Sequence, residues 1–423
     1  MLSPHRVQPK PDIPRFRTRA QPTFPAASPA SGHGALVTGA DYRALGVVRS
    51  LGRYGIPVWV LKQEGQMLGA ASRYARRGVV CPPCKNEEAQ LEFLRHLALQ
   101  QGLRGWVLFP TTDDMVALVG KHHEFLAKFY RLTTPPWTIL RWGCDKRLLH
   151  QLATDLGIAS PPTFCPRDRK EVEVLPCTFP SILKPAMRLG SNRLSREKAW
   201  RVEDRAELLA RYDEACRIVP HELLMVQEVL PGGGESQFSY AALCRNGQPL
   251  ASMMARRLRQ FPMEFGRFST YVESIDEPPI AEAAARLLAA MQFTGLVEVE
   301  FKRDPRDGKF KVLDVNPRVW GWHTLGRRAG VDFPYLAWRL VNGEDVVPVC
   351  GRPGAGWFRL GADFPMALQE IFRRRLSIAS YLKSLWSSPE WATFAWDDPL
   401  PGVAGLPIFF VMAARHWYTR GSV

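Results

Sequence analysis

Polar and apolar side chains alternate in the segment VLDVNPRVWG, residues 312–321. Side chains of a β-strand point to opposite faces in turn, so a strand here places Asp314, Asn316 and Arg318 on one face. The upstream segment VEVEF alternates in the same way and is separated from the first by a turn-rich stretch. We therefore predict a hairpin that sets Glu300 opposite Asp314.

Two carboxylates that face each other across a strand pair repel each other. A hard divalent cation between them removes this repulsion, and Mg²⁺ commonly combines one or two carboxylates with substrate phosphates. We predict that Glu300, Asp314 and Asn316 bind Mg²⁺, with Mn²⁺ as an alternative ion. The other interpretation is a solvent-exposed face on which Glu298, Glu300 and Lys302 pair by charge. The predicted core face of the same hairpin consists of Val299, Phe301, Leu313 and Val315.

Short apolar strands alternate with helical patterns in the first 135 residues, which predicts a parallel, doubly wound sheet. The strands are expected at residues 35–39, 56–61 and 106–109, and the helices at 45–51, 87–101 and 115–129. No G-x-G-x-x-G follows the first strand, which argues against a dehydrogenase. Asp113 follows the third strand. We interpret it as a helix N-cap in preference to a ligand contact, although the two roles are compatible.

The following 200 residues predict a different layout, with hairpins between the helices. Strands are expected at residues 179–185, 198–202, 223–230, 237–244 and 249–258, the hairpin described above at 295–316, and helices at 145–157, 203–217 and 280–291. The dipeptide Asn246-Gly247 is a strong hairpin turn. After Val331 the chain is expected to be helical.

Taken together, these motifs resemble the ATP-grasp superfamily, in particular its carboxylate–amine ligases, from about residue 35 to 340. The segment DVNPR, residues 314–318, is similar to the metal-binding strand E-x-N-P-R, with Asp in place of Glu. Glu300 matches the other metal ligand of the family. The strand FPSILKP carries Lys184 at the position of a phosphate-binding lysine, and Lys146 opens a helix at the position of another.

The resemblance also implies where a nucleotide binds. The hinge that grips adenine corresponds to Gln227, Glu228, Val229 and Leu230, and the acid that binds the ribose hydroxyls corresponds to Glu235. Backbone amides of the turn at Gly190 and Ser191 are expected to approach phosphate oxygens. Arg318 is expected to steady the γ-phosphate or an acyl phosphate. Arg256 and Arg257 are candidates for a similar role, but strand alternation lets only one of them face the site, and the alternative for both is a surface ion pair.

The resemblance implies an α/β protein of the ATP-grasp class. We expect a disordered basic tail (1–32), a Rossmann-like parallel-sheet domain (33–138), a two-lobed ATP-grasp domain with antiparallel sheets (139–343, with lobes 139–225 and 226–343) and a helical C-terminal extension (344–423). The implied activity is an ADP-forming ligase. ATP phosphorylates a substrate carboxylate, and an amine attacks the acyl phosphate to give an amide.

Composition sets the remaining expectations. The 423 residues carry a net charge of +15, which attracts anions such as nucleotides or acidic lipid, and no nucleic-acid-binding motif is found. Only one C-x-x-C occurs among eight cysteines, which suits reduced thiols in a cytoplasmic protein. The expected partners are small carboxylates and amines. Two rival interpretations stay open: a non-catalytic ATP-binding module, and a scaffold at anionic membranes that uses the tail, residues 373–375 and the apolar stretch 403–414.

Overall fold

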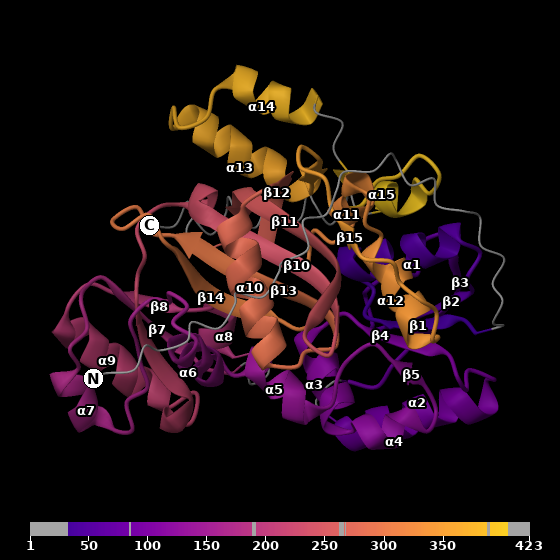
Figure 1. Cartoon of the computed structure of the whole chain (residues 1–423), viewed down its shortest axis with the longest axis horizontal. Helices are drawn as coiled ribbons and strands as arrows, with labels where there is room; N and C mark the ends of the chain where they lie inside the picture. Colours follow the sequence, from indigo (N-terminus) through magenta and orange to yellow (C-terminus); the bar gives the residue numbers. More distant parts are fainter. Residues whose placement is uncertain are drawn as a thin grey trace, which may run out of the picture.

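The computed structural model describes residues 33–83, 86–187, 192–261, 266, 268–386 and 390–404. The predicted tail at 1–32, the predicted phosphate turn at Gly190 and Ser191, and most of the apolar stretch 403–414 lie outside these residues. Three sheets follow one another along the chain, and Figure 1 shows the first at the indigo end, away from the second. The predicted fold class, a parallel sheet followed by antiparallel sheets, is confirmed. The exact domain boundaries stay predictions.

The first sheet is parallel throughout, with the order β3-β2-β1-β4-β5. Its strands are β1 (Ala35–Thr38), β2 (Val58–Lys62), β3 (Ala75–Val80), β4 (Val107–Pro110) and β5 (Arg131–Leu132). The helices are α1 (Tyr42–Arg53), α2 (Glu87–Gln100), α3 (Asp113–Lys121), α4 (His123–Ala127) and α5 (Trp137–Cys144). The central strands β1 and β4 are buried along their whole length, because helices and the following sheet cover both faces.

The second sheet is antiparallel and small, with the order β6-β9-β7-β8. Its strands are β6 (Thr163–Phe164), β7 (Ser181–Pro185), β8 (Trp200–Val202) and β9 (Leu224–Glu228). The helices of this region are α6 (Lys146–Asp155), α7 (Arg169–Val174), α8 (Arg193–Glu197) and α9 (Arg205–Cys216). Aspartates begin three of them: Asp145 caps α6, Asp168 caps α7 and Asp204 caps α9, each by accepting from a backbone amide of the first turn.

The third sheet is the largest, with eight strands in the described part of the chain. Its main path runs β14-β13-β10-β11-β12-β16-β17, and β15 pairs with β11. The long strands are β10 (Gln237–Arg245), β11 (Gln248–Phe261), β12 (Phe268–Ile275), β13 (Gly295–Arg303) and β14 (Phe310–Asn316). Asn246 and Gly247 both have positive φ, as the predicted tight turn between β10 and β11 requires. Helix α10 (Pro278–Ala290) packs on one face through Ile280, Ala284, Leu287 and Leu288.

The C-terminal region departs from the helical extension that the sequence predicts. It contains α11 (Leu325–Ala329), α12 (Phe333–Val341), α13 (Leu360–Phe372), α14 (Ile378–Trp386) and α15 (Leu400–Ala404). It also contains β15 (Val349–Cys350), β16 (Gly356–Phe358) and β17 (Glu390–Trp391), which extend the third sheet. These strands are too short to give a period-two pattern, so sequence reasoning missed them.

The end of the described chain returns to the first sheet. Asp398 is buried and accepts hydrogen bonds from Arg49 Nε (2.9 Å) and Ser72 Oγ (2.6 Å). Among the described residues, no helix is both long and apolar enough to cross a bilayer.

Candidate nucleotide and metal site

The hairpin β13–β14 sets Glu300 opposite Asp314, as predicted, and Glu298 opposite Asn316. A β-bulge follows Glu300, so that Phe301 pairs with Val312. The bulge buries Val312 and leaves Leu313 only half-buried, so placing Leu313 on the core face was wrong. A strict alternation cannot anticipate an extra residue in one strand. Glu300 and Asp314 pair directly before the bulge, so their carboxylates share a face as predicted.

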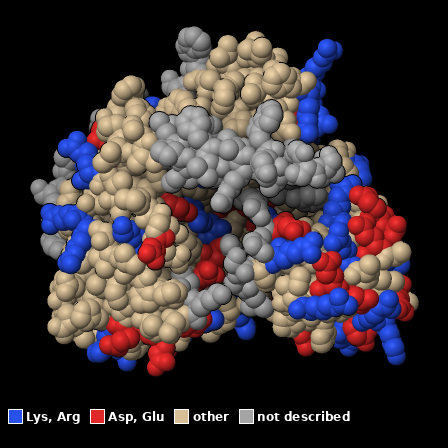
Figure 2. All heavy atoms as spheres, turned by 180° about the vertical axis from the view of Figure 1, so that it is seen from behind, with Lys and Arg blue, Asp and Glu red and all other residues tan. Residues whose placement is uncertain are grey.

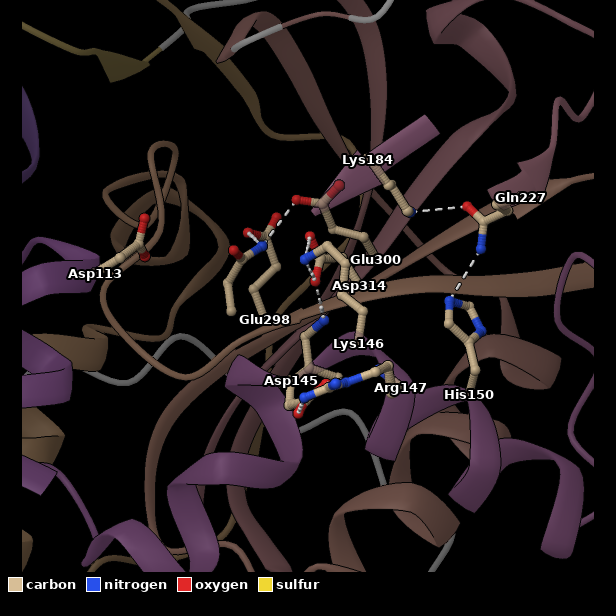
Figure 3. A network of polar contacts seen from close by, with 12 residues as sticks. Asp113, Asp145, Lys146, Arg147, His150, Lys184, Gln227, Glu298, Glu300 and Asp314 are labelled. Carbon is tan, nitrogen blue, oxygen red and sulfur yellow. Dashed lines mark hydrogen bonds and ion pairs between the residues drawn. The ribbon is translucent and has the colours of Figure 1, made fainter. Parts of the chain in front are cut away.

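Lys146 forms an ion pair with Asp314. Its Nζ lies 2.7 Å and 2.8 Å from the two carboxylate oxygens (Figure 3). Lys146 is the first residue of α6, and the cap residue Asp145 fixes the start of that helix by accepting from Arg147. Burial disfavours the charge on Lys146, but the nearby Asp314 carboxylate outweighs it and raises the pKa of the lysine. In this structure Lys146 therefore supplies the positive charge that neutralises Asp314.

Lys184, on β7, has no carboxylate partner within the described chain. Its Nζ donates to Gln227 Oε1 at 2.8 Å, and Gln227 Nε2 in turn lies 2.7 Å from Thr163 Oγ1 and 3.0 Å from His150 Nε2 (Figure 3). Burial, with Lys146 nearby, lowers the pKa of Lys184 to about 7. Burial also lowers the pKa of His150 to about 3, so its ring is neutral and accepts from the amide. A buried cation held by a neutral amide is well suited to receive an anion.

Glu300 is surrounded by donors. Its carboxylate accepts from Asn316 Nδ2 at 2.8 Å, and Arg257 Nη2 lies 3.6 Å away. Burial works against the charged form, but Arg257 and Lys198 outweigh it and lower the pKa of Glu300. Arg257 is buried and faces the site, whereas Arg256 points the other way and donates to the carbonyl of Glu235. Strand alternation thus brings one of the two candidate arginines to the site.

Glu298 belongs to the site although the sequence analysis treated it as a surface charge. It is 3% exposed and accepts hydrogen bonds from Ser239 Oγ (3.0 Å), Trp322 Nε1 (3.0 Å) and Asn316 Nδ2 (3.2 Å). Burial and the neighbouring Glu300 raise the pKa of Glu298. The signal was present, because residues two apart on a strand share a face. What the sequence did not show is that β10 and the loop after β14 cover this carboxylate.

Arg318 connects the site to the first sheet. Its Nε donates to Asp113, and its Nη2 donates to Asn316 Oδ1 at 3.2 Å. The N-cap of α3 is Thr112, whose hydroxyl accepts from the Met115 amide, so the predicted capping role of Asp113 was wrong. Because the cap is provided by its neighbour, Asp113 pairs with Arg318 instead. The amide oxygen of Asn316, which we predicted as a metal ligand, accepts this hydrogen bond from Arg318.

The predicted hinge comprises the last two residues of β9 and the two residues after it, and it carries several fixed contacts. The Val229 amide donates to the Pro180 carbonyl at 3.1 Å, and Lys302 Nζ donates to the Leu230 carbonyl at 2.7 Å. The side chain of Glu228 is paired with Arg306. Glu235 is exposed, and its carboxylate accepts from the Gly233 amide at 2.9 Å. The backbone of this segment is therefore held from both lobes.

The donor set was tested for its fit to a divalent ion. Among the described residues, no group of three or more His, Cys, Asp or Glu side chains forms a metal cage by itself. Glu300 and Asp314 nevertheless offer facing carboxylates, and cationic side chains presently balance them. This set fits an ion that takes its remaining ligands from substrate phosphates and water, as Mg²⁺ commonly does.

A parallel sheet, a small antiparallel lobe with a buried lysine and a large antiparallel sheet with facing carboxylates together define an ATP-grasp fold. The comparisons agree. A family model described as "ATP-grasp in the biosynthetic pathway with Ter operon" matches residues 221–354. The chain is 22% identical over 302 residues to a D-aspartate ligase of Enterococcus faecium, which covers 67% of this chain and 70% of that protein.

Solved structures share the fold. An L-amino acid ligase from Bacillus licheniformis superposes with a TM-score of 0.59 at 16% identity, over 77% of this chain and 78% of that one. The biotin carboxylase domain of Hydrogenobacter thermophilus 2-oxoglutarate carboxylase, solved with MgADP, ADP and bicarbonate, has a TM-score of 0.59 at 15% identity, over 76% and 73% of the two chains. The predicted resemblance to the ATP-grasp superfamily is confirmed.

Proposed function

We propose that this chain is an ATP-dependent carboxylate–amine ligase that releases ADP and phosphate. The observation that carries the proposal is that the half-buried Lys146 pairs with Asp314, which faces Glu300 across the hairpin, and that the buried Lys184 lies near enough for both carboxylates to act on its charge (Figure 3). Phosphoryl transfer needs positive charge around the phosphates and fixed positions for the reactants. The similarity to amino-acid ligases supports the same class of reaction.

In this proposal the nucleotide lies between the two antiparallel sheets. Lys146 and Lys184 bind its phosphates, together with the amides of Gly190 and Ser191. When the nucleotide binds, Lys146 leaves Asp314 and pairs with a phosphate. Lys184 contacts the neutral amide of Gln227, so its ammonium group is available to pair with a phosphate as well. Lys184 thus gains an anionic partner only when the nucleotide binds, whereas Lys146 changes from one anionic partner to another.

The hinge Gln227, Glu228, Val229 and Leu230 is assigned to adenine, and Glu235 to the ribose hydroxyls. Glu235 is exposed and lies beside Lys302, which suits a residue that closes over a bound sugar. Glu300, Asp314 and Asn316 would hold Mg²⁺, or Mn²⁺ in its place. When bound, the ion neutralises charge on the transferring phosphoryl group.

The proposed reaction has two steps, phosphoryl transfer and amide formation. An oxygen of the substrate carboxylate forms a bond to the γ-phosphorus of ATP, and the bond from that phosphorus to the β–γ bridging oxygen breaks to release ADP. The amine nitrogen then bonds to the acyl carbon, the acyl–oxygen bond breaks, and phosphate leaves as the amine loses a proton. Arg257 and Arg318 face the carboxylate hairpin and would stabilise the charge that develops on the phosphoryl oxygens.

Arg359 is a candidate for binding the substrate carboxylate. Its guanidinium is held between the rings of Tyr42 and Phe268, 4.2 Å from each centroid, and the described residues give it no hydrogen bond or ion pair. Tyr42 also touches the loop after β14, since a Cβ at Gly321 would lie 2.8 Å from its hydroxyl. This places Arg359 near the carboxyl edge of the first sheet, where ligands of such sheets bind. A stacked guanidinium keeps its planar donors available for a carboxylate.

A screen with MgATP tests the proposal. The full chain is incubated with pairs of amino acids and small carboxylates, and ADP, phosphate, AMP and pyrophosphate are measured. We expect ADP and phosphate in equal amounts that depend on both substrates, and their loss in Glu300→Gln. AMP with pyrophosphate would instead indicate adenylation. Nucleotide binding without turnover for any pair would favour a non-catalytic ATP-binding module.

A further inference from the structure

Exposed apolar side chains gather on the two helices α13 and α14. On α13, Leu360, Phe364, Leu368 and Phe372 recur every four residues, so they lie along one side of the helix. Phe372 is 79% exposed, and on α14 Ile378 is 62% exposed and Leu382 is also exposed. Soluble surfaces carry such residues singly, and a contiguous group marks an interaction surface. We call these six residues the apolar stripe.

The opposite side of α13 is fixed firmly to the third sheet. Asp363 is fully buried and forms a two-pronged ion pair with Arg259 of β11, with an Nη2–Oδ2 distance of 2.9 Å. The guanidinium of Arg259 also lies over the rings of Tyr271 and Tyr381 and donates to Ser384 of α14. Both helices are therefore anchored through one arginine. Figure 1 shows them at the top of the molecule, on the outside of the sheet.

The exposed charged residues of α13, α14 and the segment between them are all of one sign. The acids between residues 360 and 386 are Asp363 and Glu370, and both are buried. The bases are Lys383 and the run 373–375, and all of them are exposed. The surface over these helices is mostly tan in Figure 2, with Lys and Arg at one edge. A helix pair that carries exposed apolar residues and exposed bases but no exposed acid of its own is complementary to an anionic lipid surface.

We propose that the α13–α14 hairpin binds the surface of an anionic bilayer. The apolar stripe enters the boundary between headgroups and acyl chains, and the bases of 373–375 contact lipid phosphates. Helix α13 has 13 residues and is about 20 Å long, so it lies in the surface and does not span it. A second copy of the chain fits less well, because a symmetric contact through this face brings the same positive charges together.

This proposal is independent of the ligase reaction, because it uses none of the residues assigned to the nucleotide. The ligase would then act on substrates at, or delivered from, a membrane surface.

Vesicle sedimentation with the full chain tests it. Vesicles of phosphatidylcholine with about one third phosphatidylglycerol are compared with phosphatidylcholine alone, and we expect binding to the anionic vesicles only. The double variant Phe364→Ser/Phe372→Ser should weaken binding by about tenfold or more, because two phenylalanine rings no longer enter the bilayer. Arg374→Glu/Arg375→Glu should weaken it similarly and reduce its dependence on salt. The matched control is Val174→Ser, since Val174 is also 79% exposed but lies on α7.

Several outcomes overturn the proposal. One is wild-type protein that stays in the supernatant with anionic vesicles. Another is a double variant that sediments as well as the control. A third is binding that is lost only when residues 1–32 are removed, which would assign it to the tail. Self-association without lipid that the double variant abolishes would make the stripe an interface between copies.

Discussion

The substitution Lys184→Met is expected to change nucleotide binding and the free energy of unfolding in opposite directions. Lys184 is 9% exposed, and its Nζ contacts only the neutral Gln227 amide oxygen among the interactions seen in the described chain. Burial, with Lys146 nearby, lowers the pKa of Lys184 from its ordinary 10.5 to about 7. A methionine keeps the apolar stem and removes the charge. We therefore expect a variant that loses ATP binding and yet unfolds less easily.

The magnitude follows from the linkage between proton binding and folding. At about 1.4 kcal/mol per pKa unit, the lowered pKa of Lys184 destabilises the folded state at pH 7 by about 4 kcal/mol. Leaving Gln227 Oε1 without its donor costs about 1 kcal/mol, so the variant should gain about 3 kcal/mol. Between pH 7 and 10.5 the unfolded chain binds a proton that the folded chain does not. Wild-type stability therefore rises with pH in this window, and the advantage of the variant shrinks.

Urea unfolding without nucleotide, at pH 7.0 and 9.5, measures this difference. Lys309→Met is the matched control, because Lys309 is an exposed lysine at the β13–β14 turn. We expect the Lys184 variant to gain stability at pH 7.0 and to lose most of the gain at 9.5, while the control follows wild type at both. Addition of MgATP should stabilise wild type and control but not the Lys184 variant. A variant that is less stable at pH 7.0, or whose gain does not change with pH, would refute the reasoning.

Three further predictions concern the same site. Asp113→Asn weakens the hold on Arg318, so kcat should fall about tenfold while the KM for ATP stays close to wild type; an unchanged kcat in an ADP-release assay would speak against this link. At pH 8, the binding of MgATP should be accompanied by the uptake of close to one proton, because Lys184 is largely neutral in the free protein and becomes charged beside a phosphate. Titration calorimetry in two buffers of different ionisation enthalpy measures this uptake. No proton uptake would mean that the lysine is already charged in the free protein. Glu300→Gln should weaken nucleotide-dependent Mn²⁺ binding by about 100-fold in an electron paramagnetic resonance titration, with Lys309→Met as the unchanged control.

Much of the site could be predicted because its motifs lie on regular strands. The alternation around Asp314 and Glu300 predicted their opposition, which the register of β13 and β14 confirms. The position of Lys184 on a strand followed from its apolar neighbours, and β7 carries it. These patterns are local, and a strand pair preserves them in space.

What the sequence missed depends on contacts between distant segments. The pairing of Asp113 with Arg318 joins residues 205 positions apart, and nothing near Asp113 indicates its partner. Glu298 looked like a surface charge because its covering residues, Ser239 and Trp322, come from other elements. The strand β16 is three residues long and is stabilised by its neighbours in the sheet, so no pattern announces it. Tertiary contacts decide such cases, and local propensity does not.

The most direct test of the central idea is a crystal structure of the full chain with a non-hydrolysable ATP analogue and Mn²⁺, with the metal located by its anomalous scattering. We expect a peak between the carboxylates of Glu300 and Asp314, with ligand distances of about 2.1–2.2 Å and phosphate oxygens completing the coordination. Lys146 and Lys184 should each contact a phosphate. A peak elsewhere, or a nucleotide bound with both carboxylates still paired to their present cationic neighbours, would contradict it.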